Sequence, residues 1–178
     1  MPKLEVHLSA QQIDKLNDTL AAQISADYAK VLKQDEELFV IVTLKGAAFF
    51  GADLLRKITV PLSIDFVRLT SYGAGTQSSG VVHIVKDIEA PPTGKHVLVL
   101  DEIVDSGRTL SFLVDRLKSA RPASLKLCAL LSKPSRREIP VEVHYLGTEV
   151  EDKFLVGYGL DHGERYRNLK EIYRLEDI

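Results

Sequence analysis

The stretch HVLVLDEIVDSGRTLSFL, residues 96–113, decides how the rest of the sequence is interpreted. Its first half is a continuous apolar run, which predicts a strand buried on both faces. The run leads into three acids, Asp101, Glu102 and Asp105, and then into a Ser-Gly turn. A helix is expected to begin near Arg108. In α/β sheets, ligands bind beyond the carboxyl ends of such strands, so the acids mark a candidate binding site.

Outward from this stretch, strands and helices alternate along the chain. Ser9 and Gln12 have the spacing of a capping box, and apolar residues at helical spacing continue to Tyr28, so the first element should be a long amphipathic helix. Residues 46–58 predict another helix, and the Gly- and Ser-rich residues 72–80 a loop or lid. The predicted strands are residues 38–44, 61–71, 81–85, 96–103, 124–131, 141–147 and 154–160.

The fold class follows from this alternation, because fully apolar strands between helices indicate an α/β domain with a mostly parallel sheet flanked by helices. The 178 residues, 45% of them hydrophobic, suffice for one core, so a single domain over residues 1–178 is expected. The net charge of −2 gives no field for nucleic acid or an anionic membrane. One cysteine, no signal-peptide pattern and no membrane-length apolar run favour a cytoplasmic protein.

The turn after the acids has the composition of a phosphate site. Ser106, Gly107 and Thr109 stand at a helix start, where free N–H groups and the helix dipole attract anions. The acids would repel that phosphate, so they should face sugar hydroxyls or a divalent cation. A ligand with a phosphate and a ribose satisfies these features; a capped helix with solvated acids is the alternative.

At these residues the sequence resembles a known family. VLVLDEIVDSGRTL resembles the 5-phosphoribosyl-1-pyrophosphate (PRPP) motif of type I phosphoribosyltransferases. TLKGAAFFGADLLR, IDFVRLTSYGAGTQSSG, CALLSKPSRR and FLVGYGLDHGERYRNL are similar to the hypoxanthine-guanine phosphoribosyltransferases. The resemblance covers residues 40–169. It implies a type I phosphoribosyltransferase-like fold with a small hood region, and purine salvage by transfer of the phosphoribosyl group to N9 of hypoxanthine or guanine. IMP or GMP and pyrophosphate would be the products, with Mg²⁺ as cofactor and a homodimer or homotetramer as the assembly.

The resemblance also implies roles for the residues that bind PRPP. Asp101 and Glu102 would hold the ribose hydroxyls, directly or through Mg²⁺, although the family more often has Glu before Asp. Asp105 would be the general base at the purine N7; a helix cap is its alternative role. The cradle of the 5-phosphate would comprise Asp105, Ser106, Gly107, Arg108 and Thr109.

Three further segments are implied to bind PRPP. Lys45 and Gly46 would form the pyrophosphate loop, with a strained peptide bond before Lys45; a helix start with Lys45 in solvent is the alternative. Arg167 would contact pyrophosphate; a surface salt-bridge partner is the alternative. Ser71 and Tyr72 would lie at the tip of the lid, which excludes water when closed.

The implied purine pocket depends on one lysine. Lys133 would donate to the 6-oxo group, and because ammonium is only a donor, adenine should be rejected. Phe154 would stack on the base, although an aromatic residue in a strand is more often part of the core. Leu155 would meet the base through its backbone and Ile103 through an apolar contact. Asp161 would belong to this pocket and would also bind the metal that bridges pyrophosphate; a turn aspartate is the alternative.

Two other functions remain open at this point. Phosphoribosyltransferase folds also serve as regulators that bind nucleic acid, but such a protein should carry a basic face or an extra DNA-binding unit. An enzyme acting on xanthine alone or on a pyrimidine would keep the fold and change the pocket.

Overall fold

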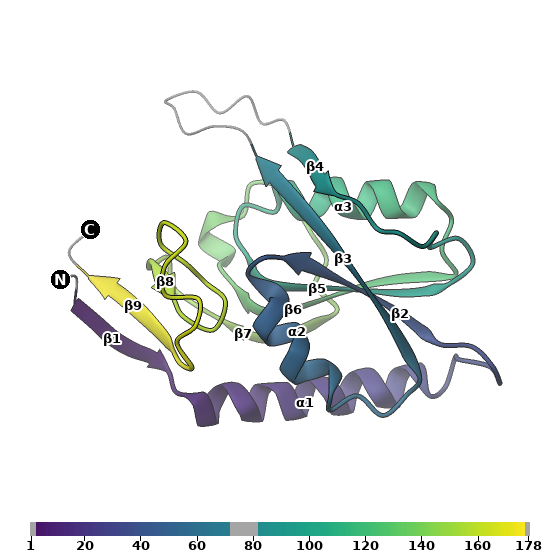
Figure 1. Cartoon of the computed structure of the whole chain (residues 1–178), viewed down its shortest axis with the longest axis horizontal. Helices are drawn as coiled ribbons and strands as arrows, with labels where there is room; N and C mark the ends of the chain where they lie inside the picture. Colours follow the sequence, from purple (N-terminus) through teal and green to yellow (C-terminus); the bar gives the residue numbers. More distant parts are fainter. Residues whose placement is uncertain (1–2, 72–81, 177–178) are drawn as a thin grey trace.

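The computed structural model describes residues 3–71 and 82–176 (Figure 1). The predicted lid, with Tyr72, lies outside the described residues. The elements in chain order are β1 (Lys3–Leu8), α1 (Ala10–Tyr28), β2 (Leu38–Leu44), α2 (Ala47–Leu55), β3 (Leu62–Ser71), β4 (Val82–Lys86), β5 (His96–Val104), α3 (Arg108–Ser119), β6 (Ser124–Ser132), the 3-10 helix η1 (Pro134–Arg136), β7 (Tyr145–Glu149), β8 (Leu155–Val156) and β9 (Ile172–Glu176). No helix within this part of the chain is long and apolar enough to cross a membrane.

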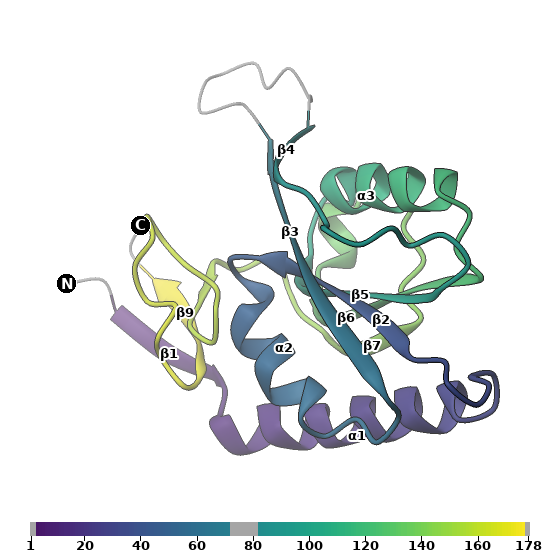
Figure 2. The ribbon, with the colours of Figure 1, turned by 45° about the vertical axis from the view of Figure 1, so that its right-hand side comes forward.

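The larger sheet has the order β4-β3-β2-β5-β6-β7. All of its strand pairs are parallel except β3 with β4, so the predicted mostly parallel sheet is confirmed. Helices α1 and α2 lie on one face and α3 on the other (Figure 2). The carboxyl ends of β2 and β5 therefore point to the same edge of the sheet.

The core lies on both faces of this sheet. Successive apolar side chains of β2 and β5 point alternately toward the two helical layers. Val40 and Leu98 pack in the cluster that includes residues of α1 and α2, whereas Ile41 and Val99 pack in the cluster that includes residues of α3. All four are fully buried. The apolar runs were thus correctly interpreted as strands buried on both faces.

A second, antiparallel sheet of the order β1-β9-β8 lies beside the first and forms the predicted hood region. The sequence prediction missed β1 and β9, so α1 is not the first element. Most of β1 is exposed, and a strand with few buried positions gives no apolar run. The capping box of Ser9 and Gln12 at the start of α1 is present as predicted.

Three predicted boundaries were wrong. The strand expected at residues 154–160 is limited to Leu155–Val156, because Gly157, Tyr158 and Gly159 all have positive φ, which strands do not adopt. The strand expected from residue 141 begins at Tyr145. Val141 and Val143, which produced the alternating pattern, pack on the core but do not belong to the strand. The second helix ends at Leu55 instead of residue 58.

A buried carboxylate anchors the segment between β4 and β5. Asp65 is 7% exposed and accepts hydrogen bonds from the backbone N–H groups of Phe66, Glu89 and Ala90, at 2.7, 2.6 and 3.3 Å. Burial raises the pKa of Asp65, but these N–H donors outweigh burial, so its pKa lies below the ordinary value. The ionised form is therefore the one that stabilises the fold.

We expect Asp65→Asn to lower the free energy of unfolding at pH 7 by about 1–3 kcal/mol, because the amide leaves buried N–H donors without an acceptor. The contribution of the carboxylate is present above its unfolded pKa of about 3.9 and is lost as the pH falls through the lower folded pKa. Urea unfolding at pH 7, 5 and 3 should show the difference between parent and variant shrinking at pH 3. A difference that is constant with pH, or equal to that of the exposed control Asp115→Asn, would contradict this account.

Candidate active site

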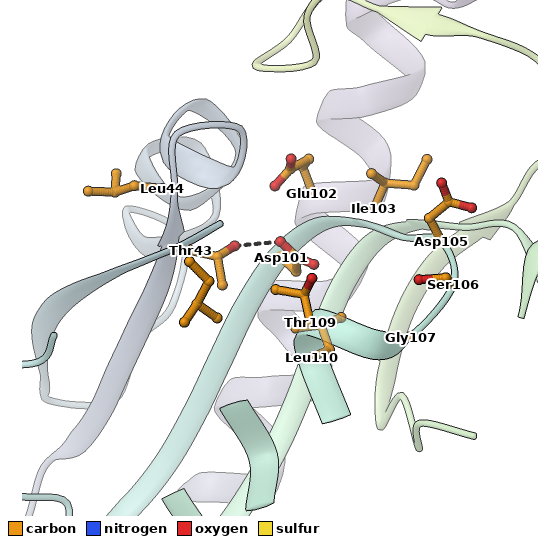
Figure 3. A pocket seen from close by; sticks show the side chains of 11 residues that line it. Thr43, Leu44, Asp101, Glu102, Ile103, Asp105, Ser106, Gly107, Thr109 and Leu110 are labelled. Atoms are coloured by element: carbon orange, nitrogen blue, oxygen red, sulfur yellow. Dashed lines mark hydrogen bonds between the residues drawn. The ribbon is translucent and has the colours of Figure 1, made fainter. Parts of the chain in front are cut away.

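A cleft of about 230 Å³ opens at the carboxyl ends of β2 and β5 and at the start of α3 (Figure 3). It contains seven of the predicted residues and four that were not predicted, Thr43, Leu44, Leu69 and Leu110. The ends of adjacent parallel strands meet at one edge, so Thr43 and Leu44 could have been predicted from topology. The lining residues are Thr43, Leu44, Leu69, Asp101, Glu102, Ile103, Asp105, Ser106, Gly107, Thr109 and Leu110.

The acidic pair forms one wall of this cleft. The hydroxyl of Thr43 donates to Oδ1 of Asp101, which joins the ends of β2 and β5. Glu102 lies against Gly46: a Cβ atom on Gly46 would be 1.9 Å from Glu102 Oε1. Burial raises the pKa of Asp101. Burial, and then the neighbouring Asp101, raises the pKa of Glu102 well above its ordinary value. The pair is thus suited to hydrogen-bond donors or a cation.

The turn at the start of α3 is a candidate anion site, in which the first helical N–H group, that of Arg108, donates to Oγ of Ser106 at 3.4 Å. Gly107 is the N-cap residue, with φ of 84° and no side-chain cap. A side chain there would also collide with the carbonyl oxygen of Ile139, at 2.3 Å from a Cβ atom. Ser106 O accepts the backbone N–H groups of Glu138 and Ile139, at 2.9 and 3.0 Å, which fixes the turn. The side chain of Arg108, in contrast, pairs with Glu138 outside the cleft lining, at 2.6 Å from Nε to Oε2.

Asp105 lies in the cleft and does not cap α3. Its Oδ1 atom is 2.8 Å from Nε of Arg136, a residue that the sequence prediction did not select. Arg136 also pairs with Asp152, whose carboxylate lies 3.6 Å from it and 3.6 Å from Nζ of Lys133. Lys133, 9% exposed, donates to Lys153 O at 2.7 Å. Asp105 and Lys133 are therefore connected through two intervening charges.

The loop after β2 meets the segment after β8. The peptide bond between Leu44 and Lys45 is cis. Gly159, with φ of 99°, lies so close to this loop that a Cβ atom would be 1.9 Å from Gly46 O. Only glycine combines that φ with that contact. The small sheet and the large sheet therefore meet at Gly46 and Gly159.

Four charged side chains surround this contact, and one of them was not predicted. Glu164 pairs with Lys45 at 2.8 Å and with Arg167 at 3.4 Å. Arg167 also pairs with Asp161 at 2.9 Å and donates to Gly159 O at 2.7 Å. Hydrogen bonds from Lys45 and then Arg167 lower the pKa of Glu164. The predicted Lys45, Asp161 and Arg167 are thus brought together, and Glu164 is part of the same DHGER stretch.

The remaining purine-pocket candidates differ in exposure. Phe154 is 43% exposed and meets His162 edge to face, with ring centroids 5.2 Å apart. The alternative of a core aromatic residue is therefore wrong. Leu155 is buried, and Ile103 lines the cleft. Ser71 ends β3.

The predicted metal ligands do not form a protein cage. Within residues 3–71 and 82–176, no three His, Cys, Asp or Glu side chains gather closely enough to hold a metal ion by themselves. Asp101 and Glu102 are adjacent, whereas Asp161 stands in the ion-pair cluster with Arg167. Mg²⁺ is usually bound by one or two carboxylates together with substrate phosphates. The adjacent acids therefore fit this ion.

Comparison with known proteins places this geometry in a family. The model of the phosphoribosyl transferase domain matches residues 8–162. The chain is 44% identical to a hypoxanthine-guanine phosphoribosyltransferase of Mycobacterium tuberculosis, over 96% of this chain and 85% of the relative. It is 42% identical to a hypoxanthine phosphoribosyltransferase of Haemophilus influenzae, over 93% and 92%.

Solved structures agree with the sequence comparison. A hypoxanthine phosphoribosyltransferase from Staphylococcus aureus has a TM-score of 0.89 and 40% identity, over 97% of this chain and 91% of that chain. A hypoxanthine phosphoribosyltransferase from Trypanosoma cruzi has a TM-score of 0.90 and 35% identity, with the same shares covered. The chain therefore belongs to the phosphoribosyltransferase family, among its hypoxanthine-guanine members.

Proposed function

We propose that this protein transfers the 5-phosphoribosyl group of PRPP to N9 of hypoxanthine or guanine, giving IMP or GMP and pyrophosphate. The observation that carries the proposal is the set of groups around one sheet edge. The glycine turn and the acidic pair line one cleft, and the loop that carries Lys45 and its ion-pair partners lies against Glu102, which suits the phosphate, ribose and pyrophosphate of PRPP. The similarity to enzymes named for these purines supports the choice of base.

PRPP binding is assigned to three groups of residues. The N–H groups at the start of α3, next to Ser106 and Gly107, bind the 5-phosphate. The acids Asp101 and Glu102, which line the cleft, have carboxyl oxygens that can accept hydrogen bonds from ribose hydroxyls. The pyrophosphate meets Lys45 and Arg167, which Glu164 neutralises in the described structure. For the 5-phosphate, the side chain of Arg108 is not needed, because it pairs with Glu138.

Mg²⁺ is the proposed cofactor; the adjacent acids Asp101 and Glu102 would hold it together with substrate oxygens, and Asp161 is proposed as a ligand of the metal at the pyrophosphate. The support is the donor set: two adjacent carboxyls whose burial raises their pKa values gain from a hard cation with oxygen preference. When bound, the cation would neutralise charge on the departing pyrophosphate.

The base pocket is assigned to the side of the site next to Ile103 and Asp105. Lys133 offers an ammonium group to the 6-oxo atom, and Phe154 offers an exposed ring for stacking. Ile103 contributes an apolar wall and Leu155 its backbone. A donor at the 6-position favours hypoxanthine and guanine over adenine, because an amino group there would meet another donor.

The chemistry joins these parts at the anomeric carbon. Departure of a polyanion from a sugar produces an oxocarbenium-like state, as in glycoside cleavage. Asp101 and Glu102 lie on the wall where that positive charge is expected, and Lys45 and Arg167 stabilise the leaving group. Asp105 accepts the proton from N7 as N9 attacks the sugar. Catalysis is then mainly positioning and charge stabilisation.

Residues 1–178 are proposed to act as one domain, because Lys45 of the large-sheet region pairs with Glu164 of the hood segment. We further propose a cytoplasmic protein that forms a homodimer or homotetramer. The single, buried cysteine agrees with a reducing compartment.

A base-competition assay tests the function directly. Purified protein, PRPP and Mg²⁺ are mixed with hypoxanthine, guanine, xanthine, adenine or uracil, and nucleotide and pyrophosphate are measured. We expect nucleotide from hypoxanthine or guanine and none from adenine or uracil, with pyrophosphate in equal amount. PRPP binding without turnover of any base, together with retained nucleic acid, would favour a regulator instead.

Replacing Lys133 by Met tests the selection of the base. Methionine keeps the buried alkyl chain and removes the ammonium, so KM for hypoxanthine should rise by about tenfold to a hundredfold, the loss expected for a charged hydrogen bond. KM for PRPP should stay at the parent value. The exposed lysine of α3 provides the control Lys118→Met. An unchanged KM for hypoxanthine would remove Lys133 from the pocket.

Replacing Asp105 by Asn tests the proposed base. The amide is similar in size and cannot accept a proton, so kcat should fall by about a hundredfold, the lower range for general base catalysis. PRPP affinity, measured by calorimetry, should be retained because the turn and the acidic pair are unchanged. Turnover at the parent rate would assign Asp105 a structural role. Asp115→Asn, the same substitution at an exposed aspartate of α3, is the control for kcat.

A further inference from the structure

Arg136 is an exposed arginine on η1 that points its charge at the proposed base. Its Nε atom is 2.8 Å from Oδ1 of Asp105, an oxygen atom that is itself buried and has no other partner among the described residues, although the Asp105 side chain as a whole is 45% exposed. A buried carboxylate oxygen needs a compensating charge or donor. We infer that Arg136 is a positioning residue that holds the Asp105 carboxylate toward the purine. This inference rests on the proposed function, because it acts through the proposed base.

The backbone places Arg136 opposite Asp105. On one side, Lys133 N donates to Val104 O at 2.9 Å; on the other, Glu138 N donates to Ser106 O at 2.9 Å. Val104 and Ser106 are the neighbours of Asp105 in the chain. The segment that carries Arg136 is therefore tied to both sides of Asp105. An exposed ion pair alone is weak, but two fixed backbones reduce the entropy lost in forming this one.

A second acid holds the other end of the guanidinium. Asp152 lies 3.6 Å from NH1 of Arg136 and 3.6 Å from Nζ of Lys133. The charges then alternate from Asp105 to Arg136, Asp152 and Lys133. This chain of charges connects Asp105, the proposed proton acceptor, to Lys133, the proposed donor for the 6-oxo group. Both side chains can therefore be held in fixed positions relative to one purine ring. Arg136 acts on the orientation of Asp105 and not on PRPP, whose phosphate turn is fixed by Gly107 and Ile139.

This role predicts a split between rate and binding. Arg136→Gln removes the charge, and the freed carboxylate can rotate out of line, so kcat should fall by about tenfold, within the range caused by small misplacements of catalytic groups. KM for PRPP should not change. Arg136→Lys keeps the positive charge but places it on a differently shaped side chain, so it should recover part of the lost kcat. An arginine that blocked Asp105 would give the opposite result, a higher kcat in Arg136→Gln.

A double-mutant cycle tests whether the effect passes through Asp105. We expect Arg136→Gln to lower kcat in the parent and to have no further effect in Asp105→Asn, because the group it positions is already inactive. Equal losses in both backgrounds would overturn the inference. A rise in KM for hypoxanthine in Arg136→Gln and Asp152→Asn alike, with kcat retained, would also overturn it and transfer the role to Lys133.

Two controls separate this result from loss of folding and from failure of the proposed function. Arg116→Gln breaks a comparably exposed ion pair, with Asp87 on the edge of the fold, and should keep parent kinetics. Thermal unfolding of each variant checks the fold. If Arg136→Gln is unfolded, Arg136→Lys and Arg136→Met replace it in the double-mutant cycle with Asp105→Asn. A parent that makes no nucleotide would overturn the proposed function and this inference together. An active parent with unchanged or additive variants would overturn the inference alone.

Discussion

The parallel pairing of β2 with β5 is the constraint on which the site depends. Both strands are buried on both faces, so their backbone polar groups must pair within the sheet. This pairing brings the end of β2, with Thr43 and the loop of Lys45, beside the end of β5, with Asp101 and Glu102. Apolar burial in the middle of the domain thereby fixes the positions of charged groups at its edge.

The charged side chains at this edge of the sheet form separate groups. Loss of hydration raises the pKa of both acids, and the neighbouring Asp101 raises that of Glu102 further. Lys45 and Arg167 share the acid Glu164 in one ion-pair group, and Lys133 pairs with Asp152 in another. Each cation already has an acid beside it. A polyanionic ligand must therefore compete with protein carboxylates, which favours ligands that bring several negative charges in the right order.

Sequence patterns predicted the parts of this molecule whose physical cause is local. The buried strands, the capping box and the glycine turn before α3 all follow from short-range periodicity or backbone freedom. The exposed strand β1 has no such signal, and β9 finds its partner at the far end of the chain. Arg136 and Glu164 could not be selected, because their importance comes from neighbours distant in sequence. Their stretches, SKPSRR and DHGER, were nevertheless part of the family resemblance.

The contact between Gly46 and Gly159 has a consequence for how this enzyme can change. The two glycines belong to segments more than a hundred residues apart, yet a side chain at position 159 would collide with the backbone of Gly46, so the shape of one segment limits the other. Mutations that reshape the loop after β2 will be tolerated only with matching changes after β8. The two segments must diversify as one unit during evolution, and a redesign for a different leaving group has to vary both at once.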